Sequence, residues 1–161
     1  MKVLGIDPSS SCSSLALVEG KELLRTWLWT KDKSKSDAQN LFNYYEWVKK
    51  VVNNPFGMPI APMACVEFLR VTRNAEASRK ISHYQAASVI ACKESGIVII
   101  EAAATSARKE ALGKGNLAKE EVDALVKKLY PDFKFKASNR GGMDETDATV
   151  LGLAGPGLAE R

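Results

Sequence analysis

The chain has 161 residues, of which 45% are hydrophobic and 26% are charged, and its formal net charge is +4. This composition is typical of a globular protein, and the length predicts a single domain over residues 1–161 that buries its own core. No apolar run approaches the roughly 18 residues that a membrane span needs, and Asp7 interrupts the stretch that an export signal requires. We therefore expect a cytoplasmic protein without a membrane partner.

The cysteine and histidine content argues against several kinds of site. Cys12, Cys65 and Cys92 cannot all pair and show no CxxC spacing, which predicts reduced thiols. His83 is the only histidine, so a multi-histidine metal site is excluded and a Ser-His-Asp hydrolase is disfavoured. A structural role is the simpler hypothesis for His83.

Three antiparallel strands are predicted in the first thirty residues. The apolar run that ends at Asp7 is typical of a buried strand, and Pro8 with the serines after it predicts a turn. Residues 13–18 and 23–30 predict the next two strands, and residues 19–22 predict the hairpin between them.

A helix is predicted next, followed by strands that alternate with helices. Apolar residues at helical spacing predict a helix over 38–52, with Ser36 or Asp37 as its N-cap. The further elements of this stretch are a loop over 53–62, a strand over 63–66 that ends in Glu67, a helix over 74–95 and a strand over 97–100.

The C-terminal part of the chain is predicted to be helical. Helices over 106–112 and 119–129 are separated by Gly113-Lys-Gly115, and a last helix over 143–153 is ended by Gly155-Pro-Gly157. The order of elements predicts an α/β protein. Its mixed five-stranded sheet has three antiparallel strands first and then two parallel strands, and it is flanked by helices.

The charge is unevenly distributed along the chain. Residues 1–67 carry 8 basic and 7 acidic side chains, residues 68–140 carry 14 and 8, and residues 141–161 carry 1 and 4. A basic centre suggests a polyanionic partner, most often nucleic acid. A solvated helical surface without any partner explains the charge equally well.

Four acidic residues stand where their side chains are able to converge. Asp7 and Glu67 end two predicted strands, and Asp144 and Asp147 lie three residues apart on one side of the last helix. Clustered carboxylates repel one another unless cations lie between them, and oxygen ligands select Mg²⁺ or Mn²⁺. Two such ions about 3.5–4 Å apart form the clamp of phosphodiester hydrolysis.

Each of these acids also has an ordinary structural explanation. Asp7 fits a turn cap that bonds backbone amides, and Glu67 fits a simple ion pair. Asp144 and Glu145 fit the first turn of a helix, where acidic side chains stabilise the dipole. Only the combination of all the acids favours a catalytic site.

Several motifs follow one another in a characteristic order. VLGIDPSSSCSSLALVE stands at the N-terminus, and Cys65-Val-Glu67 and Arg73-Asn-Ala-Glu76 come next. Arg108 with the stretch GKGNLAK, and then Asp144-Glu-Thr-Asp147-Ala, complete the set. In this order they resemble the motifs of RuvC-type Holliday junction resolvases, which have an RNase H-like fold. The resemblance spans most of residues 2–154.

The resemblance implies a homodimeric, metal-dependent DNA endonuclease that makes paired symmetric nicks in four-way junctions during recombination and repair. Its catalytic, metal-binding carboxylates are Asp7, Glu67, Asp144 and Asp147. They imply two Mg²⁺ ions per site, for which Mn²⁺ substitutes. Departures from the family include Arg70 in place of an inserted aromatic residue and a poor match over residues 31–62, which suggest a divergent, phage-encoded branch.

Basic residues of the central segment are predicted to contact DNA phosphates, since such contacts need charge and no sequence information. Arg108 and Lys119 match basic positions of the family near the scissile phosphate. The predicted DNA-binding residues are Arg70, Arg73, Arg79, Lys80, Arg108, Lys114 and Lys119.

Two other groups of residues have alternative explanations. Five aromatic side chains fit the hydrophobic core better than they fit base stacking; they are Trp27, Trp29, Tyr44, Tyr45 and Trp47. A loop with Lys31, Lys33 and Lys35 fits phosphate contacts and plain solvation equally well.

Three alternative functions stay open at this point. A branched-DNA or flap nuclease of the same fold would lack strict junction selectivity. The segment GIDPSSSCSSLAL also resembles the first phosphate loop of actin-like nucleotide-binding proteins, although 161 residues hold neither their second domain nor their second phosphate motif. A junction-binding protein without catalysis would not need four mutually repelling acids.

Overall fold

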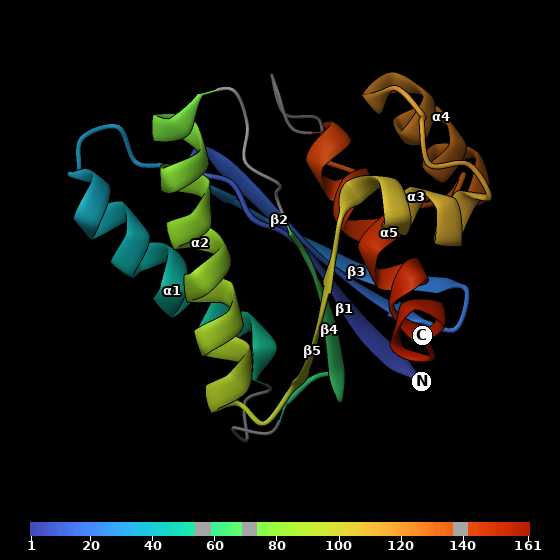
Figure 1. Cartoon of the computed structure of the whole chain (residues 1–161), viewed down its shortest axis with the longest axis horizontal. Coiled ribbons are helices and arrows are strands. Elements are labelled where there is room, and N and C mark those ends of the chain that lie inside the picture. The colour runs from blue at the N-terminus through green and yellow to red at the C-terminus, as the bar shows by residue number, and fades with distance from the viewer. Residues whose placement is uncertain (54–58, 69–73, 137–141) are drawn as a thin grey trace.

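The computed structural model describes residues 1–53, 59–68, 74–136 and 142–161. These residues form a five-stranded mixed sheet in the order β3-β2-β1-β4-β5 (Figure 1). The strands are β1 (Lys2–Asp7), β2 (Cys12–Glu19), β3 (Glu22–Thr30), β4 (Met63–Glu67) and β5 (Val98–Ala102). β1, β2 and β3 pair antiparallel, β4 pairs parallel with β1, and β5 pairs parallel with β4, which confirms the predicted α/β sheet.

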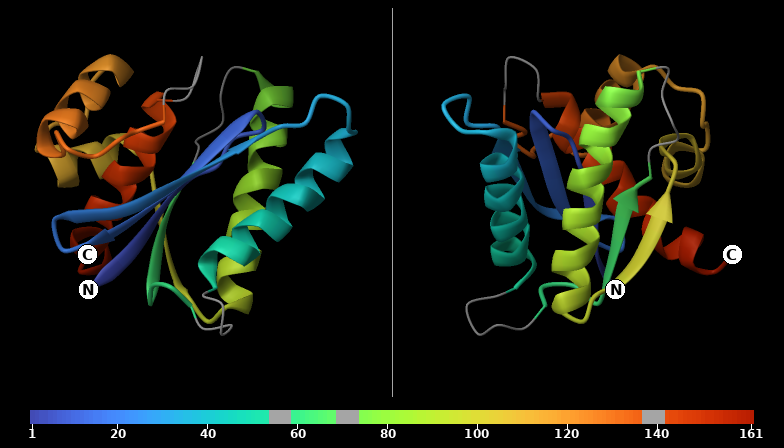
Figure 2. Two further views of the ribbon diagram at one scale, coloured as in Figure 1. Left: turned by 180° about the vertical axis from the view of Figure 1, so that it is seen from behind. Right: turned by 60° about the vertical axis from the view of Figure 1, so that its left-hand side comes forward.

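Helices cover both faces of the sheet (Figure 2). α1 and α2 pack on one face, and α3, α4 and α5 pack on the other. The helices are α1 (Asp37–Val52), α2 (Ala75–Glu94), α3 (Ala104–Leu112), α4 (Lys119–Leu129) and α5 (Gly142–Ala159). Among the described helices, none combines the length and the hydrophobicity of a bilayer-spanning segment.

The central strand β1 contributes to both layers because successive side chains of a strand point to opposite faces. Leu4 and Ile6 are fully buried in the core beneath α1 and α2. Val3 packs into the core beneath α3, α4 and α5. Gly5 also faces α5 and has no side chain to hold that helix away.

An aromatic cluster fills the layer beneath α1 and α2. The ring centroids of Trp29 and Tyr44 lie 5.2 Å apart, and those of Tyr44 and Tyr84 lie 4.9 Å apart. The buried Tyr44 hydroxyl is hydrogen-bonded to Ser88 Oγ at 2.7 Å. The predicted core role of the aromatic residues is therefore confirmed, with Trp27, Tyr45 and Trp47 packed at the edge of this cluster.

Helix α5 lies so close to the sheet that only glycine fits at the crossing. A Cβ at Gly5 would lie 1.9 Å from the Ala148 carbonyl oxygen, and a Cβ at Gly152 would lie 2.8 Å from Val18 Cγ2. Real Cβ atoms essentially never approach other atoms below 3.0 Å. The missing side chains thus set the distance between α5 and β1.

The predicted end of the last helix at residue 153 is wrong, because α5 continues to Ala159 with Pro156 inside it. An interior proline costs about 3 kcal/mol in a helix, yet the last turns gain tertiary packing. Leu158 packs against the core beneath α3, α4 and α5, and Gly155 faces Val3.

The bounds of two other elements also differ from the prediction. α3 begins two residues before its predicted start, and β5 covers 98–102 instead of 97–100.

We expect Gly152→Ala to destabilise the protein although alanine favours helices. The exchange gains about 1 kcal/mol of helix propensity but forces a Cβ against Val18 and the backbone of Gly5, and overpacking of this kind costs about 1–3 kcal/mol. Urea unfolding measures the difference. The matched control is Gly157→Ala in the same helix, where the atoms nearest the new Cβ belong to the flexible side chain of Glu110 and not to the sheet. A Gly152→Ala protein as stable as this control would contradict the proposed tight crossing.

Candidate active site

The parallel pairing of β1 and β4 brings two acidic residues to one end of the sheet. Ile6 pairs with Val66, so the next residues, Asp7 and Glu67, end neighbouring strands. Their carboxyl groups share a hydrogen bond. Gln85 of α2 donates a hydrogen bond from Nε2 to the Glu67 carbonyl oxygen at 2.8 Å, which holds the end of β4 in place.

The first turns of α5 bring the other two acids to the same end of the sheet. The charge of Asp147 acts directly on both Asp7 and Glu67. Asp144 lies one turn earlier, where its side chain is hydrogen-bonded to the Cys12 thiol of β2. The predicted convergence therefore holds for Asp7, Glu67 and Asp147, with Asp144 at the margin of the cluster.

Hydrogen bonds to buried groups fix the beginning of α5 against β2 and β3. Ser14 donates from Oγ to the Asp144 carbonyl oxygen at 2.5 Å. The fully buried Glu145 accepts from Thr26 Oγ1 at 2.7 Å and from the Lys136 backbone amide at 2.6 Å. A buried carboxylate needs such donors, and these contacts set the direction in which Asp144 points.

Two basic side chains from α3 and α4 lie against the acids. Lys119 Nζ is 2.9 Å from Asp144 Oδ1 and 3.3 Å from Asp147 Oδ2. An Arg108 guanidinium nitrogen is 3.3 Å from Asp147 Oδ1, and another donates to the Leu117 carbonyl oxygen at 3.0 Å. Arg108 and Lys119 therefore lie beside the acids, and their contact with DNA stays a prediction.

The acids have more negative charge than the nearby cations balance. Burial raises the pKa of Asp7 well above its ordinary value, and the charges of Glu67 and Asp147 raise it further. Burial also raises the pKa of Glu67 and of Asp147. Burial opposes the charge on Lys119, but its hydrogen bond with Asp144 and the charges of Asp147 and Asp144 raise the pKa of Lys119 overall.

The residues present fit a hard divalent cation in chemistry and in charge. All the donors are carboxylate oxygens, which Mg²⁺ and Mn²⁺ prefer, and the raised carboxyl pKa values mark a site that added positive charge would stabilise. Within the described part of the chain, no three His, Cys, Asp or Glu side chains form a group that is able to hold one ion. Lys119 bridges Asp144 and Asp147 instead, so binding of an ion by the full set requires this lysine to move.

Sequence reasoning missed four residues that hold the site together: Cys12, Ser14, Gln85 and Glu145. Each makes its contact across a long stretch of chain, so no local pattern indicates it. The sequence predicts only a reduced thiol at Cys12, yet this side chain lies beside Asp144. Burial, and then the charge of Asp144, raise the pKa of Cys12 to about 11. One of the four leaves a signal in the sequence: Ser14 is a polar residue within a predicted strand, and a buried hydroxyl indicates a hydrogen-bond partner.

Three other predicted DNA-binding residues, Lys114, Arg79 and Lys80, lie outside the acidic cluster. Lys114 is exposed on the loop after α3. Arg79 and Lys80 line a separate pocket on the first turns of α2. Arg70 and Arg73 lie outside the described residues, so the structure does not place them.

Similar proteins of known structure share this arrangement of strands and helices. The chain superposes on RuvC of Thermus thermophilus with a TM-score of 0.75 at 23% identity, covering 99% of this chain and 96% of that one. A second structure, of T. thermophilus RuvC in complex with a Holliday junction substrate, matches with a TM-score of 0.79 at 18% identity, covering 99% and 95%. The fold is thus the RNase H-like fold of RuvC.

Sequence comparison identifies the family. The family model described as "Crossover junction endodeoxyribonuclease RuvC" matches residues 3–153. Relatives with the same description include one from Trichlorobacter lovleyi, 31% identical over 134 residues (80% of this chain, 72% of the relative), and one from Methylorubrum extorquens, 27% identical over 179 residues (99% and 92%). The chain belongs to the RuvC family, whose members are divalent-metal-dependent nucleases.

We expect Asp7→Asn to stabilise the protein in the presence of a chelator at neutral pH. A carboxyl whose pKa is higher in the folded than in the unfolded chain reduces stability progressively as the pH rises from the unfolded pKa through the folded one. Asparagine removes that charge, and in a chain of this size each kcal/mol gained raises the melting temperature by about 2–4 °C. Thermal melts from pH 4 to pH 8 measure the effect, which should shrink towards the acidic end.

The control is Asp132→Asn, which removes the charge of an exposed aspartate. An Asp7→Asn protein that melts at or below the wild-type temperature over the whole pH range would contradict the strained carboxyl cluster.

Proposed function

We propose that this chain is a metal-dependent endonuclease that resolves four-way DNA junctions by paired symmetric nicks, in recombination and repair. The observation that carries the proposal is the convergence of Asp7, Glu67 and Asp147 from three separate elements, beside Arg108 and Lys119. In a member of the RuvC family, this arrangement supports phosphodiester hydrolysis.

The carboxylates are proposed to be the catalytic, metal-binding residues. Asp7, Glu67, Asp144 and Asp147 would hold two Mg²⁺ ions, for which Mn²⁺ substitutes, because their oxygens suit hard cations. Such ions supply an activated water and stabilise the leaving oxygen of the scissile phosphate. The backbone contact of Gln85 keeps the end of β4, and with it Glu67, in place.

The basic side chains at the site are proposed to act on the phosphate. Arg108 places a delocalised guanidinium charge at the edge of the carboxylate cluster, and Lys119 places a compact ammonium charge there. Positive groups aimed at a phosphoryl centre stabilise the charge that develops there during hydrolysis. Lys119 is 42% exposed, so its ammonium group is free to turn from the carboxylates towards a bound strand.

The proposed partners are junction DNA and a second copy of the chain. A four-way junction presents two equivalent strands, which suits a dimer with two-fold symmetry and two sites. The exposed side chains of Phe42 on α1 and Ile90 on α2 supply apolar area that a second copy would cover.

We further propose that residues 1–161 form one nuclease domain that works in the cytoplasm, of a bacterium or of a phage host.

We expect the protein to nick a synthetic four-way junction symmetrically in Mg²⁺ or Mn²⁺. Asp7→Asn and Asp147→Asn should lower the rate about 100-fold or more, since each removes a charge at the reacting centre. Asp132→Asn is the matched control. End-labelled junction, flap, fork and duplex DNA compared side by side measure selectivity.

A preference for the junction supports resolution, whereas equal cleavage of flaps and forks would instead indicate a general branched-DNA nuclease. Absence of symmetric nicks, together with Asp7→Asn behaving like the wild type, would refute the proposal.

We expect Lys119→Met to impair cleavage more than folding. The substitution keeps the aliphatic stem but removes the charge beside the phosphate, so the cleavage rate should fall about 100-fold. The half-exposed ion pairs that it breaks contribute about 1 kcal/mol or less each. Single-turnover cleavage and thermal melting give the two readouts, with Lys127→Met on the same helix as the control. A large fall in melting temperature with little loss of cleavage would mark Lys119 as structural.

A further inference from the structure

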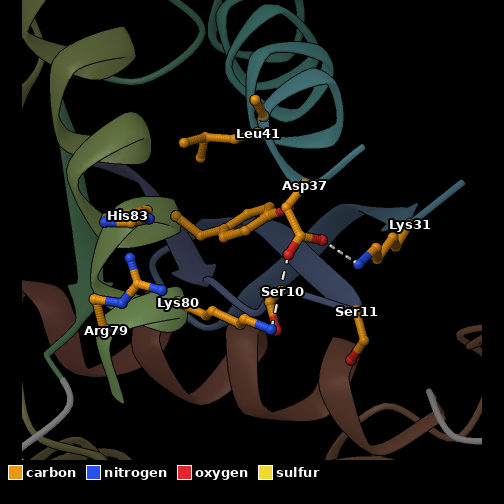
Figure 3. Close-up of a pocket in the computed structure, with 10 residues that line it drawn as sticks. Ser10, Ser11, Lys31, Asp37, Leu41, Arg79, Lys80 and His83 are labelled. Atoms are coloured by element: carbon orange, nitrogen blue, oxygen red, sulfur yellow. Dashed lines mark hydrogen bonds and ion pairs between the residues drawn. The ribbon is translucent and has the colours of Figure 1, made fainter. Parts of the chain in front are cut away.

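The pocket that Arg79 and Lys80 line is a cavity at the same end of the sheet as the acidic cluster, on the side of α1 and α2. It encloses about 420 Å³. Its wall comes from the turn after β1, the loop after β3 and the first turns of α1 and α2 (Figure 3). The polar residues that matter for its chemistry are Ser10, Lys31, Asp37, Arg79, Lys80 and His83.

The cavity holds more positive than negative side chains. Lys31 Nζ lies 2.5 Å from Asp37 Oδ1, and Lys80 Nζ lies 3.7 Å from Asp37 Oδ2. Figure 3 shows the Asp37 carboxylate between these two ammonium groups. Lys80 also pairs with Glu76 outside the cavity, at 3.1 Å. Arg79 makes no ion pair with any described residue, so its charge is left for a ligand.

The position of Asp37 resembles that of a bound anion. Its pKa is lowered by the hydrogen bond from Lys31 and by the charges of Lys31 and Lys80, so it stays ionised. Asp37 is not needed as a helix cap, because Ser36 accepts the hydrogen bond from the Gln39 amide at 3.2 Å. The carboxylate thus occupies the point where two lysines converge (Figure 3), and Ser10 lines the same cavity.

The cavity is connected to the acidic cluster through one short turn. Ser11, which also lines it, accepts a hydrogen bond at its carbonyl oxygen from the Lys31 amide at 2.9 Å. The next residue, Cys12, is hydrogen-bonded to Asp144. The cavity and the acids therefore lie on either side of the same turn, at one end of the sheet.

We propose that this cavity binds a backbone phosphate of the DNA, which displaces the Asp37 carboxylate from Lys31 and Lys80 and pairs with Arg79. The proposal rests on the proposed nuclease function and adds a contact away from the reacting phosphate. Contacts of this kind fix the register of a strand without reading its sequence. Asp37 then weakens binding, because the DNA must break the ion pairs of Asp37 before it forms its own.

Two substitutions with opposite predicted effects test the pocket. Asp37→Asn should tighten binding of a labelled four-way junction about two- to tenfold, because it removes the competing anion and keeps the shape of the side chain. Arg79→Ala should weaken binding by a similar factor and reduce the slope of log Kd against log salt concentration by about one. Fluorescence anisotropy in Ca²⁺ at several salt concentrations measures both, and melting temperatures confirm folding.

Matched controls separate the pocket from net charge. Asp32→Asn makes the same change in the loop just before α1, where Asp32 pairs with Lys35 outside the cavity. Lys93→Ala removes a cation from the last turn of α2. The change in Kd caused by Asp37→Asn must be larger than that caused by Asp32→Asn, and the change caused by Arg79→Ala must be larger than that caused by Lys93→Ala. Affinities no different from those of the controls would overturn the proposal that the cavity binds a DNA phosphate.

Two further readouts separate the possible failures. Melting in inorganic phosphate tests a free anion as the ligand: stabilisation that depends on Arg79, with no effect of either substitution on DNA affinity, would overturn a DNA-phosphate site. Junction cleavage by the wild type in Mg²⁺ is measured in parallel. Failure of that cleavage would count against the nuclease function, whereas normal cleavage with unchanged variant affinities would count against the pocket alone.

Discussion

The close crossing of α5 over β1 is the constraint on which the site depends. Gly5 and Gly152 leave no Cβ between the helix and the strand, so the backbone of α5 packs directly against the backbone of β1. Asp147, two turns into the helix, then comes within electrostatic range of Asp7 and Glu67. A larger side chain at either glycine would lift the helix and separate acids that lie far apart in the sequence. Ser14 and Glu145 complete the arrangement by fixing the beginning of α5 to β2 and β3.

The same arrangement explains the electrostatic character of the site. Burial raises the pKa values of the three carboxyl groups, and repulsion by neighbouring acids raises those of Asp7 and Glu67 further. These raised pKa values oppose folding at neutral pH. Lys119 and Arg108 offset part of that repulsion. A site that is strained on its own and relieved by added positive charge is well suited to hold divalent ions against a DNA phosphate. Asp37 shows the complementary arrangement in the neighbouring pocket, where an acid of the chain lies between two lysines that suit a phosphate.

Sequence reasoning reached the sheet and the acids because both depend on local patterns. Apolar runs that end in Asp7 and Glu67 mark strand ends, and the three-residue spacing of Asp144 and Asp147 places both on one side of a helix. It failed at Pro156, where packing of Leu158 and Gly155 outweighs the local stop signal. It also missed contacts between distant segments, such as Gln85 with Glu67 and Cys12 with Asp144, because no spacing encodes them. The grouping of Lys31 with Arg79 is of the same kind, since two loops and two helices must fold before these side chains meet.

The central claim is that the carboxylates gathered by the α5–β1 crossing form the divalent-ion site. Crystals of the wild-type protein soaked in Mn²⁺ test it most directly, through anomalous scattering from the bound ion. The account predicts anomalous density among the carboxylates of Asp7, Glu67 and Asp147, with the Lys119 ammonium displaced from Asp147. Anomalous density elsewhere on the molecule, or none in crystals that hold Mn²⁺ at saturating concentration, would contradict it.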